Sequence, residues 1–301
     1  MKSASRKLRV DPTLYLMLLP AVILVAVYSY GPLAGLVIAF QSYDIAMGIR
    51  ASEWVGLDNF RFLFKFPTFN QVIWNTVYIS FLKLVVRFIV PIVVSILLNE
   101  IKRVKYKKAI QTMIYLPHFI SWVVISGILI SVLNPTDGII NGLITFFGGK
   151  PIYFLGDNSV FTGVLVVSDA WKDFGYGTII YMAALTSIDS NLYEAASIDR
   201  ANRWQKIWNI TIPGIIPIMI LVGTLSMGNL LNAGFDQVFN LYNPLVYSTG
   251  DILDTFLYRI GIDNAQYDIA TAAGMIKSAV SLGLVSISYF LAYKLADYRI
   301  F

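Results

Sequence analysis

Six long apolar stretches constrain the fold of this chain more than any other feature. A helix of about 20 mostly apolar residues is long enough to cross a bilayer, and runs of this kind occupy residues 13–40, 72–98, 109–133, 160–185, 214–231 and 269–295. Charged residues make up 14% of the sequence, whereas a soluble domain is about 25% charged. The sequence therefore predicts an all-α integral membrane protein with six transmembrane helices.

Lys and Arg residues are distributed unevenly over the segments that flank these stretches. Fourteen of them belong to one side, namely Lys2, Arg6, Lys7, Arg9, Lys102, Arg103, Lys105, Lys107, Lys108, Arg200, Arg203, Lys206, Lys294 and Arg299. The other side holds five, namely Arg50, Arg61, Lys65, Lys150 and Arg259. Since positively charged loops stay in the cytoplasm, we expect both termini inside. The predicted organisation is a cytoplasmic tail at 1–11, one transmembrane domain at 12–295 and a cytoplasmic tail at 296–301.

The net charge of +5 needs no nucleic-acid partner, because Lys and Arg residues beside a membrane favour contact with anionic lipid. The first stretch is too long for the apolar region of a signal peptide, so we expect it to be retained. The absence of cysteine excludes disulfides, iron–sulfur clusters and thiol catalysis. The single histidine, His118, cannot form a metal site with a second His or Cys, and we expect it to be packed and hydrogen-bonded. Pro117 beside it predicts a kink in the third helix.

The segment 188–213 is polar and helix-forming, although it connects two strongly apolar stretches. Asn191 or Ser190 is expected to cap a helix there. Because no Gly or Pro lies between 192 and 212, the helix should run from about Leu192 to a bend before Pro213. Two interpretations remain open from these residues. The segment is either a docking helix for a protein partner or an amphipathic helix on the inner leaflet, anchored by its tryptophans.

The same segment contains Glu194-Ala195-Ala196 and, further along, Ile210-Thr211-Ile212-Pro213. This spacing resembles the EAA loop of the permeases of binding-protein-dependent ABC importers, where Glu-Ala-Ala is followed by three residues, Gly, nine residues and Ile-x-Leu-Pro. Arg200 takes the place of the Gly, and Ile212 that of the Leu. Glycine would permit a bend at that point, whereas we expect Arg200 to continue the helix.

In that family the loop is a coupling helix that inserts into a cleft on the ATPase subunit and transmits nucleotide-driven movement to the membrane helices. The resemblance implies this role for Glu194, Ala195, Ala196, Ile198, Asp199, Arg200, Ala201, Arg203, Ile210 and Pro213. The chain has no phosphate-binding loop of the type Gly-x-x-x-x-Gly-Lys-Ser/Thr. We therefore expect a permease subunit that is not itself an enzyme and binds no cofactor or metal, while a partner ATPase binds ATP and Mg²⁺.

Motifs in other parts of the chain extend the resemblance: DPTLYLMLLP at 11–20, NE at 99–100, YLPHFISWVV at 115–124, WKDFGY at 171–176 and RWQ at 203–205. They are similar to the LplB-like oligosaccharide and polysaccharide permeases, a MalF-like group of carbohydrate importers. The resemblance implies the MetI-like fold of type I importer permeases, a bacterial cytoplasmic membrane and an oligosaccharide cargo. The implied partners are a second related permease, expected to be a different chain, two ATPase subunits and an extracytoplasmic sugar-binding protein or lipoprotein.

Polar residues near or within the apolar stretches are candidates for the substrate pathway, because charge is costly to bury in a bilayer. They are Lys83, Arg87, Asp169, Trp171, Lys172, Asp173, Tyr176, Asn229, Asn232 and Asp236. Carboxylates and amides hydrogen-bond sugar hydroxyls, and aromatic rings pack on the apolar faces of sugars. The alternative is structural: Lys172 and Asp173 would form an ion pair that fixes helix packing.

Lys83 and Arg87 are four residues apart, a spacing at which like charges repel on one helix face. They are expected to face a water-filled cavity, an acidic partner such as Asp169 or Asp173, or an anionic cargo. We expect Lys277 in the sixth helix to serve packing or a subunit interface. Two other functions remain open: an ion-coupled secondary sugar transporter that uses these charges, and a membrane scaffold that transports nothing.

Overall fold

The computed structural model describes residues 12–228 and 230–296. Within these ranges the chain divides into two compact units. The first contains residues 12–65 and Ile260–Met275, and the second contains residues 66–259 and 276–296. The described residues are mostly helical, as the apolar stretches predicted.

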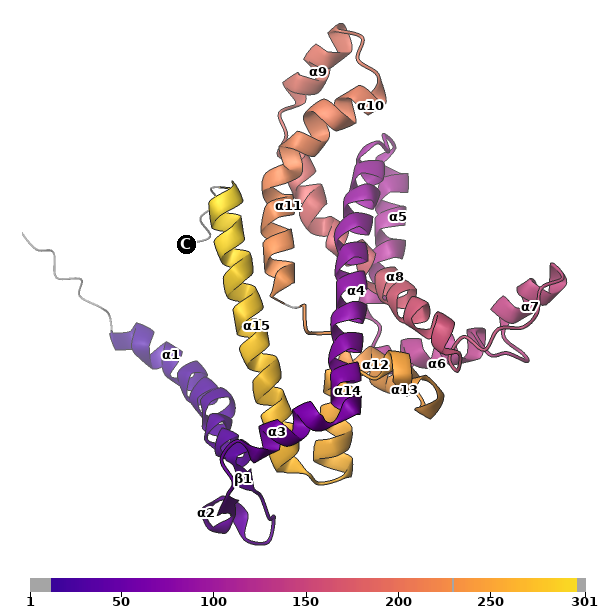
Figure 1. The fold of residues 1–301 in the computed structure, drawn as a ribbon. Coiled ribbons are helices and arrows are strands. Elements are labelled where there is room, and N and C mark those ends of the chain that lie inside the picture. The colour runs from indigo at the N-terminus through magenta and orange to yellow at the C-terminus, as the bar shows by residue number, and fades with distance from the viewer. Residues whose placement is uncertain (1–11, 229, 297–301) are drawn as a thin grey trace, which may run out of the picture. The chain divides into compact units, whose positions relative to one another are not determined.

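The first unit contains a long apolar helix and a small hairpin (Figure 1). Along its length the helix changes from α-helical winding to π and then 3₁₀ winding: α1 (Pro12–Val25), η1 (Ala26–Tyr30) and η2 (Gly31–Phe40). The hairpin pairs β1 (Gln41–Ser42) antiparallel with β2 (Glu53–Trp54). The unit is completed by α2 (Gly48–Ala51), α3 (Asp58–Lys65), η6 (Arg259–Asp263) from Ile260 onward, and the first part of α15 (Tyr267–Ala296). The Tyr43 backbone N–H donates a hydrogen bond to Asp268 Oδ2 at 3.4 Å, which ties the hairpin to the start of α15.

The second unit is a helical bundle built around two long helices that pack along each other, α4 (Pro67–Asn99) and α8 (Asn158–Thr186). Its other elements are α5 (Val104–Tyr115), η3 (Leu116–Phe119), α6 (Trp122–Val132), α7 (Ile139–Phe146), α9 (Ser190–Ile198), α10 (Arg203–Lys206), η4 (Ile207–Thr211), α11 (Ile212–Met227), α12 (Phe235–Leu241), η5 (Pro244–Val246), α13 (Tyr247–Gly250), α14 (Leu253–Tyr258) and the rest of α15. The turn between α4 and α5 and the α9–α10 segment lie at one end of this unit, and α12 to α14 lie at the other (Figure 1).

Glycines allow α8 to approach its neighbours closely. A Cβ atom added to Gly175 would lie 1.9 Å from the carbonyl oxygen of Ile114 on α5, and one added to Gly177 would lie 2.8 Å from Pro91 Cγ on α4. Small residues permit backbone-to-backbone contact between helices, and this contact drives helix association in membranes. The polar helix α8 is therefore held in the bundle by direct packing of its backbone.

Four helices are long and apolar enough to cross a membrane: Tyr15–Phe40, Pro67–Asn99, Arg203–Met227 and Tyr267–Phe290. A fifth crossing requires the pair Val104–Phe119 and Trp122–Val132, which is bent by 101°. The prediction of six spans is therefore not established by length and composition within the described residues. The missing span is α8, whose 29 residues include Asp169, Lys172 and Asp173. The kink predicted at Pro117 is confirmed, because the third helix breaks directly after the 3₁₀ turn that contains this proline.

The connection between α6 and α8 contains the short helix α7, which follows a turn at 134–138. The buried Asn141 side chain fixes the connection. Its amide donates hydrogen bonds to the carbonyl oxygens of Asn134 and Ile152, at 3.0 Å each, and accepts one from the Ile152 N–H at 2.8 Å.

The prediction of one continuous helix over 192–212 was wrong, because the segment forms two helices, α9 and α10. Asp189, rather than Asn191 or Ser190, caps α9 by accepting a hydrogen bond from the Asn191 N–H at 2.9 Å. The helix ends at Ile198, and Arg200, two residues further on, has the left-handed backbone angle φ 54°. The Ala201 N–H bonds the Ala196 carbonyl at 2.9 Å, and the Arg200 N–H bonds the Ser197 carbonyl at 3.2 Å.

These two hydrogen bonds form a Schellman motif, the helix ending in which glycine usually occupies the left-handed position. Arg200 therefore adopts the conformation that we expected only a glycine to permit at this place. The bonds satisfy carbonyl groups that the end of α9 would otherwise leave unpaired, and this gain offsets the steric cost of a side chain in the left-handed region. Asn202 then begins α10 with a capping box that includes Gln205.

We predict that Arg200→Gly stabilises the protein by about 1 kcal/mol, because only a residue with a Cβ atom is strained at positive φ. Arg200→Val should destabilise it, since a β-branched side chain is still less compatible with this region. Thermal unfolding of the purified transporter complex measures both changes. A glycine variant less stable than the wild type would show that contacts of the arginine side chain outweigh the strain.

Candidate transport cavity and coupling loop

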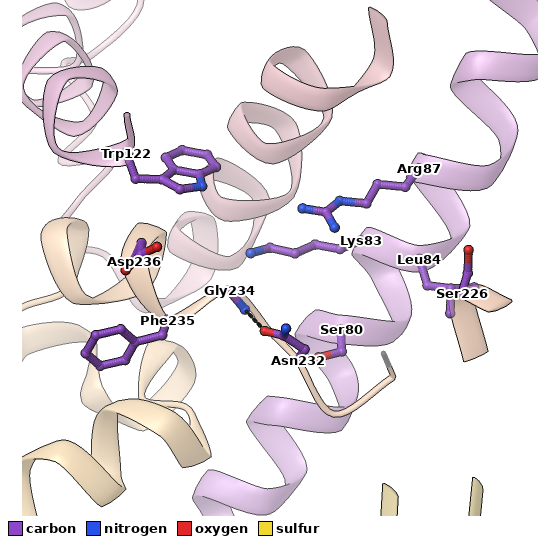
Figure 2. A pocket seen from close by; sticks show the side chains of 10 residues that line it. All are labelled: Ser80, Lys83, Leu84, Arg87, Trp122, Ser226, Asn232, Gly234, Phe235 and Asp236. Carbon is purple, nitrogen blue, oxygen red and sulfur yellow. Dashed lines mark hydrogen bonds between the residues drawn. The ribbon is translucent and has the colours of Figure 1, made fainter. Parts of the chain in front are cut away.

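A cavity of about 520 Å³ opens in the second unit between α4, the start of α6 and the segment between α11 and α12 (Figure 2). Its wall combines charged, amide, hydroxyl and aromatic side chains. The lining residues are Ser80, Lys83, Leu84, Arg87, Trp122, Ser226, Asn232, Gly234, Phe235 and Asp236. A concave site with a few convergent polar groups and aromatic rings is typical of a small-molecule site.

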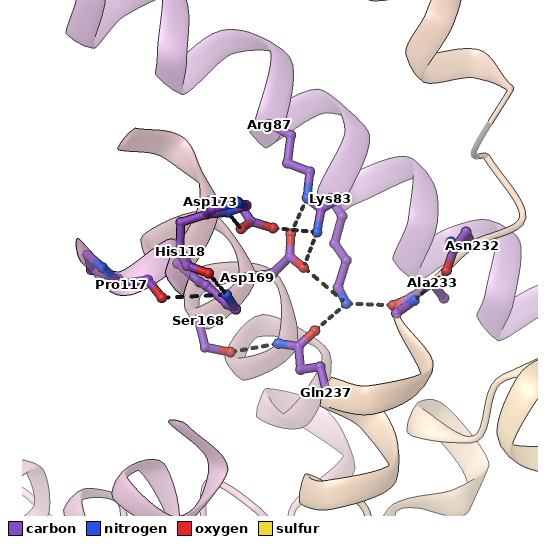
Figure 3. Close-up of polar contacts among 12 residues, drawn as sticks. Lys83, Arg87, Pro117, His118, Ser168, Asp169, Asp173, Asn232, Ala233 and Gln237 are labelled. Carbon is purple, nitrogen blue, oxygen red and sulfur yellow. Dashed lines mark hydrogen bonds and ion pairs between the residues drawn. The ribbon is translucent and has the colours of Figure 1, made fainter. Parts of the chain in front are cut away.

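The charged side chains of α4 and α8 form an ion network (Figure 3), and two of its members, Lys83 and Arg87, line this cavity. Arg87 donates from Nε to Asp169 Oδ2 and from Nη2 to Asp169 Oδ1, at 2.7 Å each. Its Nη2 also donates to Asp173 Oδ2 at 2.9 Å, and Lys83 Nζ lies 3.6 Å from Asp169 Oδ1. The Asp169 side chain is only 2% exposed. Of the alternatives for Lys83 and Arg87, an acidic partner on α8 is confirmed.

Lys83 also holds the chain between α11 and α12 in place. Its ammonium donates to the Ala233 carbonyl at 2.6 Å and to Gln237 Oε1. Gln237 in turn donates to the Leu165 carbonyl and to Ser168 Oγ, at 2.8 Å each. Gln237, which is fully buried, was not among the predicted residues. The available signal was its position beside Asp236 in a short polar segment after the fifth apolar stretch.

Lys172 does not pair with Asp173, so the structural alternative was wrong in this detail. Its ammonium donates to the carbonyl oxygens of His118, at 2.5 Å, and Pro117, at 3.5 Å, and lies 5.8 Å from the centre of the Trp122 ring. The physical reason is the break between α5 and α6. A helix end leaves carbonyl groups without intrahelical donors. Lys172 donates to the His118 carbonyl there and, at longer distance, to the Pro117 carbonyl, which also accepts from the Ile120 N–H.

His118 connects the break to the ion network. Its Nδ1 lies 2.9 Å from Asp173 Oδ1, and its ring stacks on Tyr176 with centres 4.0 Å apart and planes at 5°. The predicted packed and hydrogen-bonded role of this histidine is confirmed. Asp173 thus joins α4, through Arg87, to the 3₁₀ turn η3, through His118.

The structure separates the candidate pathway residues into groups. Lys83, Arg87, Asn232 and Asp236 line the cavity, and Asp169 and Asp173 bind the cations behind its wall. Trp171 instead lines a separate apolar pocket of about 550 Å³ beside α6 and α8. Lys172 and Tyr176 are not among the residues that line the cavity, and Asn229 lies outside the described residues. Trp122, Phe235 and Ser80 were not predicted as lining residues.

The α9–α10 segment presents most of the predicted coupling residues to solvent. Exposed residues are Glu194, Ala195, Ile198, Asp199, Arg200, Arg203 and Pro213, and half-buried residues are Ala196, Ala201 and Ile210. Ile198 is 82% exposed and Trp204 is 70% exposed. Apolar side chains this exposed within a charged surface are typical of an interaction site.

Two side-chain contacts give this segment a defined shape. Tyr193 Oη and Thr211 Oγ1 lie 2.9 Å apart, which joins α9 to η4 just before α11. Lys206 Nζ donates to Ser197 Oγ at 2.7 Å, which joins α10 to the end of α9. The two helices are therefore linked to each other and to the start of an apolar helix that is long enough to cross a membrane.

Two further ion pairs stabilise the opposite end of the second unit. Arg259 Nη2 donates to the buried Asp251 Oδ2 at 2.5 Å, and its guanidinium lies 4.6 Å from the centre of the Tyr247 ring. Burial favours a lower pKa for Arg259, but its hydrogen bond to Asp251 and the charge of that carboxylate hold the pKa above the ordinary value. Lys277 forms an ion pair with Asp254 in the same chain. This contact agrees with the packing role, one of the two roles predicted for Lys277.

Comparison with known proteins identifies the family. Residues 91–301 match the family described as binding-protein-dependent transport system inner membrane component. The chain is 41% identical to the polygalacturonan/rhamnogalacturonan transport system permease protein YteP of Bacillus subtilis (strain 168), over 96% of this chain and 90% of that protein. It is 39% identical to protein LplB of the same organism, over 95% of this chain and 90% of that protein.

Among solved structures, one neighbour is the bacterial alginate ABC transporter in complex with an alginate pentasaccharide-bound periplasmic protein. The TM-score is 0.89 at 36% identity, covering 96% of this chain and 97% of the other. A second crystal structure, of a bacterial ABC transporter involved in the import of the acidic polysaccharide alginate, gives a TM-score of 0.88 at 37% identity and covers 95% of this chain and 96% of the other. The chain therefore belongs to the family of binding-protein-dependent transport system inner membrane components, as its motifs predicted.

Proposed function

We propose that this chain is the permease subunit of an ABC importer that takes up an oligosaccharide delivered by an extracytoplasmic solute-binding protein. The observation that carries the proposal is the cavity, whose carboxylate, amide, hydroxyl and aromatic side chains suit a sugar. It lies in the same unit as the exposed α9–α10 segment. Relatives that match almost the whole chain are named for the transport of polygalacturonan, rhamnogalacturonan and alginate.

In the proposed topology the chain crosses a bacterial cytoplasmic membrane six times with both termini inside. α8 supplies the sixth crossing, and it is tolerated in the bilayer because its charges are paired or hydrogen-bonded. The uneven distribution of Lys and Arg supports the orientation. The turn between α4 and α5 and the α9–α10 segment lie at one end of the second unit, which agrees with two cytoplasmic loops.

The proposed assembly contains a second, different permease and two ATPase subunits that bind ATP and Mg²⁺, so this chain needs no cofactor and no catalytic residue. Closure of the ATPases would push on Glu194 and the rest of α9. The contact between Tyr193 and Thr211 would pass this movement to α11, one wall of the cavity. Transport requires that the cavity bind cargo with different affinity in its two orientations.

The coupling role is tested by the ATPase activity of the co-expressed complex in nanodiscs, with a binding protein loaded with oligosaccharides. We expect Glu194→Ala to reduce the stimulated ATPase rate at least tenfold while the complex still assembles. Glu53→Ala, which removes another exposed carboxylate in the first unit, is the matched control and should retain the wild-type rate.

Stimulation that survives in Glu194→Ala would refute the coupling role of α9. Failure of any ATPase to copurify with the wild-type chain would refute the proposed assembly. Uptake that persists without ATPase and depends on a proton or sodium gradient would support the ion-coupled alternative. No observation on the described residues favours that alternative or a scaffold that transports nothing.

A further inference from the structure

We propose that the cavity selects an anionic oligosaccharide and that Arg87 receives a carboxylate of the cargo through the free edge of its guanidinium group. The inference rests on the proposed function, because it takes the cavity to be part of the sugar pathway. It adds the charge class of the cargo, the residue that recognises it and the orientation in which the cargo binds.

The hydrogen bonds of Arg87 leave one edge of the guanidinium group available. A guanidinium group has five N–H donors in a fixed planar arrangement. Nε and Nη2 bind Asp169 and Asp173, whereas Nη1 makes no hydrogen bond to any residue that the structure describes. The Arg87 side chain is 48% exposed and lines the cavity. The two carboxylates therefore fix the plane of the group and leave the donors of Nη1 for a ligand.

The distribution of charge on the cavity wall also favours an anion at the Arg87 end. Among the described residues that line the cavity, Lys83 and Arg87 lie together on α4, and the carboxylate of Asp236 lies away from Arg87 (Figure 2). Asp169 and Asp173 bind the two cations but do not line the cavity. A cargo carboxylate would therefore be favoured at the cavity-facing side of Arg87.

Other lining residues are suited to the neutral part of a sugar. Figure 2 shows Asp236 beside Trp122 and away from Arg87. The exposed side chains of Asn232 and Asp236 can hydrogen-bond hydroxyl groups, and the Trp122 ring can cover an apolar face of the sugar. The carboxylate of Asp236 would repel a cargo carboxylate at its own end of the cavity. The cargo should therefore bind in one orientation, with its carboxylate towards Arg87.

A buried hydroxyl group on the same helix as Arg87 lacks a hydrogen-bond partner within the described residues. Ser80 lines the cavity on α4, one helical turn before Lys83, and its Oγ atom makes no hydrogen bond within the described part of the chain. A buried hydroxyl without a partner is costly, and most buried side-chain polar atoms in native proteins have one. A bound polar ligand that reached Ser80 after a small side-chain rotation would supply the missing bond.

Direct binding to the complete complex in nanodiscs, without nucleotide or binding protein, tests the inference. The probes are trigalacturonate and trimannuronate, each compared with its carboxyl-reduced neutral counterpart, so that the members of a pair differ only in charge. For wild type we expect at least one acidic trimer to bind tenfold or more tightly than its neutral counterpart. Arg87→Lys keeps the positive charge but loses the planar donor edge. In this variant the ratio of the affinity for the acidic trimer to that for the neutral trimer should fall towards one.

Each outcome separates the inference from the function on which it rests. Equal wild-type affinity for acidic and neutral trimers would overturn the role of the carboxylate but leave the cavity as a sugar site. Binding of no trimer by the wild-type complex would overturn the cavity as the sugar pathway. If an assembled Arg87→Lys complex still prefers the acidic trimer as strongly as the wild type does, a group other than Arg87 binds the carboxylate. The wild-type comparison needs no variant, so the inference stays testable even if Arg87→Lys fails to assemble.

Discussion

In Asp169→Ala we expect the free energy of unfolding to fall by about 3–5 kcal/mol, the usual effect of removing one partner from a buried ion pair. The loss is large because Asp169 is the carboxylate shared by Arg87 and Lys83. Without it, Lys83 would lose its carboxylate partner in the network, and Arg87, four residues away on α4, would keep only Asp173. Thermal inactivation of the purified complex and the yield of assembled complex measure the effect.

Two further variants test this explanation. Asp58→Ala removes a carboxylate from the exposed pair of Asp58 and Arg61, whose side chains are 66% and 72% exposed, and such surface pairs contribute about 0–1 kcal/mol. The double variant Lys83→Met, Asp169→Ala also removes the cation that Asp169→Ala leaves without its carboxylate partner. It should recover part of the stability that Asp169→Ala loses. An Asp169→Ala complex as stable as the Asp58→Ala complex would contradict the role of the network.

The second large effect is expected at Gly175, where Gly175→Ala should prevent normal packing of α8 against α5. The added methyl group would lie 1.9 Å from the Ile114 carbonyl oxygen, and this neighbour is backbone rather than a flexible side chain. Overpacking of this kind costs about 1–3 kcal/mol and sometimes more. We expect a loss of assembled complex and of thermal stability, because the two helices must separate to accommodate the methyl group.

Gly163→Ala is the matched control on the same helix, because nothing lies within 4 Å of a Cβ atom built at Gly163. Alanine is favoured over glycine inside a helix by about 0.5–1 kcal/mol, so this variant should be as stable as the wild type or slightly more stable. Equal behaviour of the two alanine variants would show that the close approach of α8 and α5 is not required for folding.

The helical class and the approximate positions of most spans follow from the apolar stretches, because burial in a bilayer leaves a strong local signal. The EAA spacing likewise located the exposed α9–α10 segment. The break between α9 and α10 could not be predicted from the sequence. Arg200 has a high intrinsic tendency to continue a helix, and only the two Schellman bonds at the end of α9 explain its left-handed backbone.

The candidate site was predicted in part for a similar reason. Lys83 and Arg87 had to find acidic partners, and the spacing of Asp169 and Asp173 on α8 made those residues the natural choice. The partner of Lys172 could not be deduced, because carbonyl groups become available only where the third helix breaks. Trp122 was missed as a lining residue because it begins a strongly apolar helix and resembles a lipid-facing residue in the sequence.

The pairing of the charges on α8 also bears on how the protein enters the membrane during synthesis. A charged residue at the centre of a helix costs about 2.5–3.5 kcal/mol to insert, and α8 carries Asp169, Lys172 and Asp173. All their partners, on α4 and in the turn η3, precede α8 in the chain and leave the ribosome first. In the proposed topology, α8 therefore enters a membrane that already holds counter-charges and free carbonyl groups for it. The order of the segments in the chain therefore lets α8 insert by packing against partners that are already in the membrane.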